Sequence, residues 1–322
     1  MLIAQTGAGV SQAIGTGGRD LSEAVGGRTM LAGLAALQGD PDTGVIVLIS
    51  KPPAAAVAAR VLAEVKRSHK PTVVCFLGAE PGPIEAAGAI PATNLTQAAA
   101  LAAAVAAATA TATATGANWC EALVRLEEAS VGLIAAAAVE QAKLAPGQYA
   151  LRGLFAGGTF CYEAQLILKN LPEPVVSNAL LVKANKMPDS HVSRGHVCVD
   201  LGEDEFTQGR LHPMIDPSLR NRRILQEAHD PATAVILLDI VLGYGAHPDP
   251  AGAAVEAIRE AQRLAAAAGR HVVFVASVCG TEGDPQPLGQ QEAKLRAAGV
   301  LVQPDNASAA RLAGLITQAL HA

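Results

Sequence analysis

The chain has 322 residues, half of them apolar, and a formal net charge of −5. A chain of this length can bury a sizeable core, and we expect two domains. Lys and Arg are scattered along the sequence and aromatic residues make up 3% of it. The chain therefore lacks the basic surface and the stacking side chains of nucleic-acid-binding proteins, and no nucleic-acid partner is predicted.

The cysteines are odd in number, lie far apart and include no Cys-x-x-Cys pair, which argues against a disulfide framework or a zinc site. No basic-then-apolar leader precedes a cleavage site, and the Ala-rich runs carry too many Thr, Gln and Glu residues for membrane spans. We therefore predict a cytoplasmic protein with no metal ion and no membrane partner. The cysteines are Cys75, Cys120, Cys161, Cys198 and Cys279.

Apolar strands alternate with helices along the chain, the pattern of right-handed βαβ units. The first half predicts a strand at 45–50, a helix at 53–70 and a strand at 72–78. The second half predicts strands at 149–155, 234–243 and 271–280, with helices at 160–170 and 249–269. The strands are nearly continuous in Val, Ile and Leu, so we expect them to be buried on both faces of parallel sheets in an α/β fold.

An Ala-rich region separates these two halves. Residues 96–119 have low complexity, and 121–148 have better apolar spacing and end near the turn signal Pro146-Gly147. We therefore predict a first domain at 1–115, a helical linker at 116–148 and a second domain at 149–322.

The two halves share an internal similarity. In "GDPDTGVIVL" (39–48) and "HDPATAVILL" (229–238), Asp-Pro, Thr, Val-Ile and Leu recur in register, and each segment follows a Leu-Gln pair. In both, a helix should end near the Gln, Asp-Pro should turn the chain, and a buried strand should follow. We interpret this as a duplication with a period of roughly 190 residues, the size of paired domains. Chance similarity between two ordinary α/β segments is the alternative.

Glycine-rich turns follow several predicted strands, at 15–20, 156–159, 242–249 and 279–284. Ligands of parallel α/β sheets bind beyond the carboxyl ends of the strands, where glycines let backbone amides approach an anion. None of the turns has the Lys-Ser/Thr ending of a P-loop, and each is also explained as a tight turn between strand and helix. The candidate anion-binding residues here are Gly15, Gly17, Gly18, Arg19, Gly157, Gly158, Thr159, Gly243 and Gly245.

His212 is the best-placed titratable residue, next to Arg210 and four residues before Asp216. A neutral imidazole can act as a general base or acid near pH 7, and Arg210 together with Arg220 can hold an oxyanion. The alternative is that His212 bonds the backbone of its loop and that Asp216 starts a helix. We predict His212 and Asp216 as catalytic residues and Arg210 as a binding residue.

His247 directly follows a strand end and is a further binding candidate. Cys161 and Cys279 also lie near glycine turns, but isolated buried cysteines usually serve packing. We expect structural roles for Glu163 and Asp239.

Five segments of the chain together carry a family resemblance, namely "GVSQAIGTGGRDLSEAVGG", "VIVLISKPP", "LRGLFAGGTFCYEA", "GRLHPMIDPSLRN" and "LLDIVLGYGAHPDPA". They resemble the FdrA family, whose members are similar to succinyl-CoA synthetase. The resemblance extends over essentially the whole chain. It implies that the first domain looks like the ligase half of a succinyl-CoA synthetase α subunit and the second like the ligase domain of the β subunit, both flavodoxin-like.

Two departures from this family matter. Its members usually carry an N-terminal CoA-binding domain, whereas this chain begins apparently inside the helix that would follow it, so the domain is expected from another chain or from a longer gene. Succinyl-CoA synthetases also carry phosphate on a His in a Gly-His-Ala-Gly loop, whereas residues 79–94 contain no His. Phosphohistidine chemistry at that position is excluded, and ATP-driven CoA ligation by this chain alone is disfavoured.

The resemblance further implies a link to carbamoyl transfer, in which a carbamoyl group passes to phosphate and oxamate leaves. That reaction needs neither CoA nor a phosphohistidine. We therefore expect an acyl- or carbamoyl-transferring subunit, with thioester formation beside partner subunits and a non-catalytic scaffold as the alternatives. The expected partners are a small anionic substrate and either partner subunits or a separate CoA-binding domain. No cofactor is predicted firmly, and phosphate and CoA are the candidate ligands.

Overall fold

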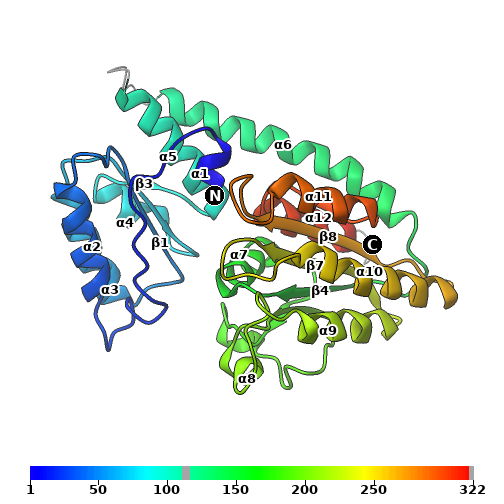
Figure 1. Cartoon of the computed structure of the whole chain (residues 1–322). Coiled ribbons are helices and arrows are strands. Elements are labelled where there is room, and N and C mark those ends of the chain that lie inside the picture. The colour runs from blue at the N-terminus through cyan, green and yellow to red at the C-terminus, as the bar shows by residue number, and fades with distance from the viewer. Residues whose placement is uncertain (111–116, 319–322) are drawn as a thin grey trace. The chain divides into compact units, whose positions relative to one another are not determined.

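The computed structural model describes residues 1–110 and 117–318 (Figure 1). The chain divides into two compact units, residues 1–128 and 129–322. Helix α6 (Ala117–Gln141) spans this division, within the region that the sequence predicts as a helical linker.

The first unit contains a parallel sheet of three strands in the order β1-β2-β3. Helices α2 and α3 share a buried core with β1 and β2, centred on Leu34, Leu48, Val61 and Val74. Helix α5 packs on β1 and β2 as well. The elements are α1 (Leu2–Gln5), α2 (Arg28–Gly39), β1 (Ile46–Ser50), α3 (Ala55–Lys66), β2 (Thr72–Phe76), α4 (Pro81–Ala86), β3 (Ile90–Pro91) and α5 (Leu95–Ala110).

The second unit contains a parallel sheet of six strands in the order β5-β6-β4-β7-β8-β9. When the short edge strand β5 is left out and the other strands are numbered from 1 in chain order, this is the flavodoxin order 2-1-3-4-5. The elements are β4 (Ala150–Phe155), α7 (Gly158–Leu168), β5 (Val175–Ser177), η1 (Lys183–Asn185), β6 (His196–Asp200), α8 (Asp204–Thr207), α9 (Ser218–His229), β7 (Thr233–Val241), α10 (Pro250–Ala267), β8 (Val273–Cys279), α11 (Leu288–Ala297), β9 (Leu301–Gln303) and α12 (Asn306–Gln318).

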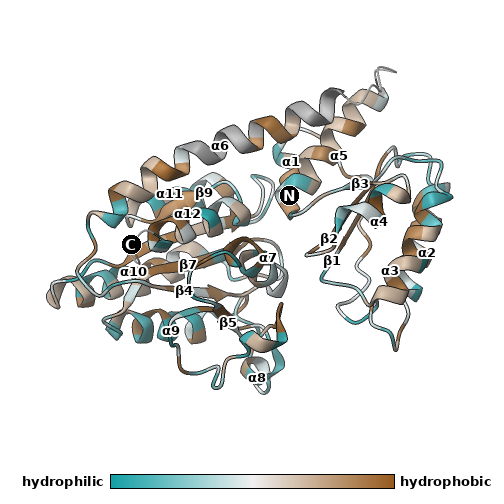
Figure 2. Cartoon of the chain, turned by 180° about the vertical axis from the view of Figure 1, so that it is seen from behind, coloured by the Kyte–Doolittle hydropathy of each residue, from teal (hydrophilic) through white to brown (hydrophobic). Residues whose placement is uncertain are grey.

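Helices cover both faces of this larger sheet. One buried cluster joins α9, α10 and α11 to the strands, and a second joins α7 and α12 to the opposite face. Strands β4 and β7 are buried along nearly their whole length and are mostly hydrophobic, apart from Arg152, Thr233 and Asp239 (Figure 2). Burial on both faces explains why their residues do not alternate between polar and apolar.

The predicted α/β class with two parallel sheets is confirmed. Each strand predicted from sequence corresponds to one of β1, β2, β4, β7 and β8, within a few residues. Strands β3, β5, β6 and β9 were not predicted from sequence. Strands β3, β5 and β9 have three residues or fewer and give little periodic signal, and β6 begins with His196 and ends with Asp200, so its apolar run is short.

The duplication is visible in local geometry. Both bounds of α9 lie 190 residues after those of α2. The Asp40 side chain accepts a hydrogen bond from the amide two residues later at 3.1 Å, and Asp230 does the same at 2.9 Å. The amides of Thr43 and Thr233 close the two turns on the Asp carbonyls. The helix, the Asp-Pro turn and the following strand are therefore one motif used twice.

Across residues 1–110 and 117–318, no helix combines the length and the apolar character that a bilayer crossing requires.

Candidate functional site

The chain order of the second unit places its candidate site. The chain leaves β4 towards β6 on one side and returns to β7 on the other, so the strand order reverses between β4 and β7. Crevices for ligands form at the carboxyl ends of strands at such a point. The loops after β4, β6, β7 and β8 all end at this edge, and they contain most of the predicted site residues.

Asp239, near the end of β7, lies at the centre of this edge and is buried. Its carboxylate accepts the amides of Ala156 and Gly157 at 2.7 and 2.8 Å. The predicted anion position at the Gly157 amide is therefore filled by the chain's own carboxylate. Two backbone donors at the start of α7 attract negative charge, and a side chain 82 residues away supplies it.

Arg220, in the first turn of α9, is the partner of Asp239. Its Nη1 donates to the Asp239 carbonyl at 2.6 Å and lies 3.4 Å from a carboxylate oxygen. Burial raises the pKa of Asp239, and Arg220 and the two backbone amides counteract that effect. Because Arg220 is tied to Asp239, it is not available to hold an oxyanion as the sequence analysis expected.

His212 lies at the same edge, with its ring half-buried. Its Nδ1 accepts the Met214 amide at 3.3 Å, which leaves the proton of the neutral ring on Nε2. Burial lowers the pKa of His212, and the charge of Asp239 raises it in part. The ring is therefore neutral at pH 7, and within the described residues Nε2 makes no hydrogen bond.

Gly202, just after β6, is what lets His212 approach. A Cβ at Gly202 would lie 2.6 Å from His212 Nε2, 3.0 Å from the Ala156 carbonyl oxygen and 3.1 Å from an Asp200 carboxylate oxygen. The ends of β4 and β6 and the loop before α9 therefore meet around this glycine. Gly202 and Asp200 were not among the residues predicted from sequence, although the Asp-Leu-Gly at the end of an apolar run was an available signal.

Asp216 and His247 have structural contacts. Asp216 accepts the Ser218 amide at 3.0 Å, and this bond at the start of α9 lowers its pKa. The His247 amide donates to the Met214 carbonyl at 2.8 Å and its Nδ1 accepts the Asp249 amide at 3.0 Å. The geometry favours capping for Asp216. It makes His247 the residue that joins the loop after β7 to the loop carrying His212.

The remaining candidates at this edge differ in availability. The Gly243 amide donates to the side chain of Gln286 at 3.0 Å, so this amide already has an acceptor. Gly245 and Arg210 are exposed. The amides of Gly158 and Thr159, in the first turn of α7, have no acceptor among the described residues. They are the backbone donors that remain for a ligand.

The candidates in the first unit lie in the loop before α2. Gly15, Gly17, Gly18 and Arg19 are exposed, whereas the adjacent Asp20 is buried. The Asp20 carboxylate accepts the amides of Thr29 and Met30, at the start of α2, at 2.9 and 2.8 Å. The start of this helix is thus also occupied by a carboxylate of the chain.

Cys161 and Cys279 do not offer reactive thiolates. Burial raises the pKa of Cys161 well above its ordinary value, and it raises the pKa of Cys279 to about 11. Both are protonated at pH 7, as expected of packing residues.

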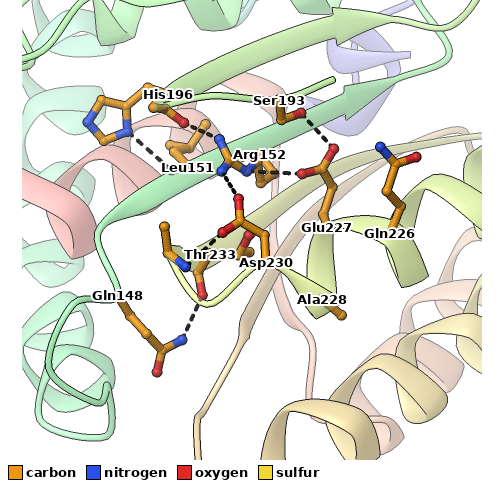
Figure 3. Close-up of polar contacts among 12 residues, drawn as sticks. Gln148, Leu151, Arg152, Ser193, His196, Gln226, Glu227, Ala228, Asp230 and Thr233 are labelled. Carbon is orange, nitrogen blue, oxygen red and sulfur yellow. Dashed lines mark hydrogen bonds and ion pairs between the residues drawn. The ribbon is translucent and has the colours of Figure 1, made fainter. Parts of the chain in front are cut away.

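A buried ionic network lies at the opposite edge of the sheet (Figure 3). Arg152 of β4 bonds Asp230 at 2.5 Å, and its Nε lies 3.0 Å from Glu227, close enough for an ion pair although not aimed as a hydrogen bond. Arg223 bonds the other oxygen of Glu227 at 2.5 Å. Because this edge holds the amino ends of the strands, away from the crevice, we assign the network to stability.

Comparison with known proteins now defines the class. Residues 154–316, about half of the chain, match the family model described as CoA-ligase. The protein belongs to the CoA-ligase family. It is 41% identical over 311 residues to the uncharacterized protein YahF of Escherichia coli (strain K12), an alignment that includes 97% of this chain and 58% of YahF. The chain thus spans little more than half the length of this relative.

Solved structures show a weaker likeness. The dinucleotide forming acetyl-coenzyme A synthetase 1 of Ca. Korarchaeum cryptofilum, in complex with phosphate and ADP, is 14% identical with a TM-score of 0.37. PH0766 from Pyrococcus horikoshii OT3 is 11% identical with a TM-score of 0.34. Both alignments cover 89% of this chain and 55% of the other. Scores this low say nothing about activity.

Proposed function

We propose that the chain transfers an acyl group from a small anionic donor to phosphate at the carboxyl edge of β4, β6 and β7, and that the group is a carbamoyl group as in the FdrA family. The observation that supports this is the neutral His212, whose Nε2 proton has no acceptor within the described residues, at the same edge of the sheet as the amides of Gly158 and Thr159, which have no acceptor there either. Such donors suit the oxyanion of acyl transfer.

The chemistry balances without a cofactor. A phosphate oxygen attacks the carbamoyl carbon of oxalurate, the C–N bond to the oxamate nitrogen breaks, and that nitrogen takes the proton that phosphate gives up. His212 acts here as a hydrogen-bond donor to the carbonyl oxygen, because Nδ1 is engaged and Nε2 carries the proton. This role replaces the general base expected from sequence.

Thioester formation with CoA is the second candidate. Membership of the CoA-ligase family favours it. It requires a source of activated acyl group, and residues 79–94 contain no His to carry phosphate. Partner subunits would have to supply that step.

One assay separates these functions. The purified chain, alone and mixed with the proteins encoded beside it, is incubated with oxalurate and labelled phosphate, and carbamoyl phosphate is measured. We expect formation that falls about 100-fold in His212→Ala, the typical loss of one oxyanion donor. His229→Ala, an exposed histidine at the other end of α9, is the matched control.

Other outcomes have defined meanings. CoA-dependent nucleotide hydrolysis without carbamoyl phosphate would support the ligase instead. Activity in the mixture that is unchanged in His212→Ala would leave the chain a scaffold subunit and would contradict the proposal.

A further inference from the structure

Gln286, in the loop between β8 and α11, is buried, with 4% of the residue exposed. Its side-chain oxygen accepts the Gly243 amide at 3.0 Å, and its side-chain amide donates to the carbonyls of Gly243 and His247 at 3.1 and 2.9 Å. The Ala246 amide donates to the same Gly243 carbonyl at 3.1 Å and closes a turn. One side chain therefore binds both ends of the turn 243–247, which follows β7.

The loop that carries Gln286 is itself held in shape. The Asp284 carboxylate accepts the Thr281 amide at 2.6 Å and the Thr281 hydroxyl at 3.1 Å. The Leu288 amide, at the start of α11, donates to the Thr281 carbonyl at 3.3 Å. Gln286 thus extends from a loop that is closed on itself, and a buried side chain with all its hydrogen bonds made is rigid.

The turn 243–247 leads to His212. The His247 amide donates to the Met214 carbonyl at 2.8 Å, and the Met214 amide donates to His212 Nδ1 at 3.3 Å. Met214 is therefore held by the turn through its carbonyl and holds the imidazole ring through its amide. Hydrogen bonds connect Gln286 to the His212 ring through His247 and Met214.

The bond to Nδ1 decides which ring nitrogen of His212 carries the proton. While the Met214 amide donates to Nδ1, the proton of the neutral ring stays on Nε2. If Met214 moved away, Nδ1 could take the proton and Nε2 would become an acceptor. The distance of 3.3 Å is long for a hydrogen bond, so a small displacement of Met214 breaks it.

We propose that Gln286 is a positioning residue for His212. By binding Gly243 and His247, it holds Met214 where the Met214 amide keeps the ring proton on Nε2. The consequence for catalysis rests on the proposed function, in which that proton is donated to the carbonyl oxygen of the substrate. The effect of Gln286 on the ring itself is a property of the folded chain and can be measured without substrate.

Gln286→Met tests the proposal, because it keeps the length of the side chain and removes its acceptor and both donors. Nitrogen NMR of the chain with labelled histidines reports the tautomer, and the His212 signals are those missing in His212→Ala. We expect the native ring to carry its proton on Nε2, and the Nδ1 signal of the variant to move towards that of a ring that exchanges between tautomers. In the assay described above, kcat should fall about 10-fold with little change in KM, because the donor acts in the transition state.

Gln148→Met is the matched control. Gln148 is also buried, and its side chain donates to the Thr233 and His271 carbonyls at 2.6 and 2.8 Å, at the amino edge of the sheet (Figure 3). We expect this variant to lose stability in urea as Gln286→Met does, and to leave the His212 signals and kcat unchanged.

Gln286→Glu serves if Gln286→Met fails to fold by circular dichroism. It keeps the length of the side chain and an acceptor for the Gly243 amide, and it removes the amide group that donates to the Gly243 and His247 carbonyls. We expect the same change in the His212 signals.

Three results would overturn the proposal: a native His212 ring without its proton on Nε2, an unchanged tautomer in the folded Gln286 variant, or an equal change in Gln148→Met. The proposed function fails separately, if the native chain forms no carbamoyl phosphate. A changed tautomer in the Gln286 variant would support the positioning role in that case too.

Discussion

At the scale of single residues, carboxylate side chains of the chain accept hydrogen bonds from backbone amides near the starts of two helices. Asp239 bonds the turn after β4, and Asp20 bonds the start of α2. The turn after β4 was predicted as an anion site from sequence, because an open amide cluster and one closed by a distant side chain contain the same residues. At this edge of the second unit, the donors without an acceptor among the described residues include the amides of Gly158 and Thr159 and the Nε2 atom of His212.

Gly202 tests how tightly this edge is built. In Gly202→Ala the new Cβ would lie 2.6 Å from His212 Nε2, so the ring must move. We expect carbamoyl phosphate formation to fall about 10-fold or more, since small displacements of catalytic groups are costly. Gly283→Ala, where a Cβ meets nothing closer than 3.7 Å, is the control. Equal activity of the two variants would separate His212 from catalysis.

The pH behaviour of His212 follows from its surroundings. Burial lowers its pKa, so the folded chain binds fewer protons here than the unfolded chain between that pKa and 6.5. The contribution of His212 to stability is present above pH 6.5 and is lost as pH falls through the lowered pKa. We expect its NMR titration midpoint to lie below 6.5 and to fall further in Asp239→Asn, which removes the charge that raises it. A rise in that variant would contradict the assignment.

At the scale of elements, buried charges hold strands and helices together. Glu227 of α9 sits between Arg152 of β4 and Arg223 of its own helix, and Ser193 donates to it at 2.6 Å (Figure 3). The network ties β4, α9 and the loop before β6 to one another. Buried ion pairs of this kind add little net stability when complete but are costly to break.

Glu227→Gln leaves two buried arginines with one fewer negative charge. We expect the free energy of unfolding to fall by about 3–5 kcal/mol, as for other broken buried pairs. Glu260→Gln removes the exposed partner of Arg263 and should lower the free energy of unfolding far less, because water screens an exposed ion pair. Urea unfolding measures both, and similar small losses would show that the network is not important for stability.

Asp20 plays a corresponding part for α2. Burial acts to raise its pKa, but the amides of Thr29 and Met30 outweigh this and lower it. Asp20→Asn keeps an oxygen acceptor but removes the negative charge at the start of α2, so we expect it to cost the first unit up to about 1 kcal/mol near pH 7. This difference should be present above about pH 4 and vanish as pH falls through the lowered pKa. A difference that persists in acid would rule out the carboxylate as its source.

At the scale of the whole molecule, one motif of helix, Asp-Pro turn and strand serves two units with separate cores. The core around Leu48 and Val61 belongs to the first unit, and the two clusters on the six-stranded sheet belong to the second. The strand of this motif is an edge strand in the first unit, where it is β1, and a central strand in the second, where it is β7.

Separate cores imply separate unfolding. We expect residues 129–322, expressed alone, to unfold in one cooperative transition, because the sheet and both helix layers lie within this segment. Calorimetry of the whole chain should show that same transition together with a separate transition of the first unit, and Asp20→Asn should shift only the transition of the first unit. Aggregation of the isolated segment with loss of its secondary structure would contradict this view.

The sequence by itself determined the α/β class, the long strands and helices and the repeated Asp-Pro turn, because hydrophobic runs and turn residues act locally. Short strands such as β5 and β9 stayed hidden, since three residues carry little periodicity. Only the tertiary structure decided which turns are open. Asp239 meets the Gly157 amide because β4 and β7 are neighbours in the sheet. Contacts between residues so far apart in the chain depend on which strands become neighbours, and no local pattern encodes that.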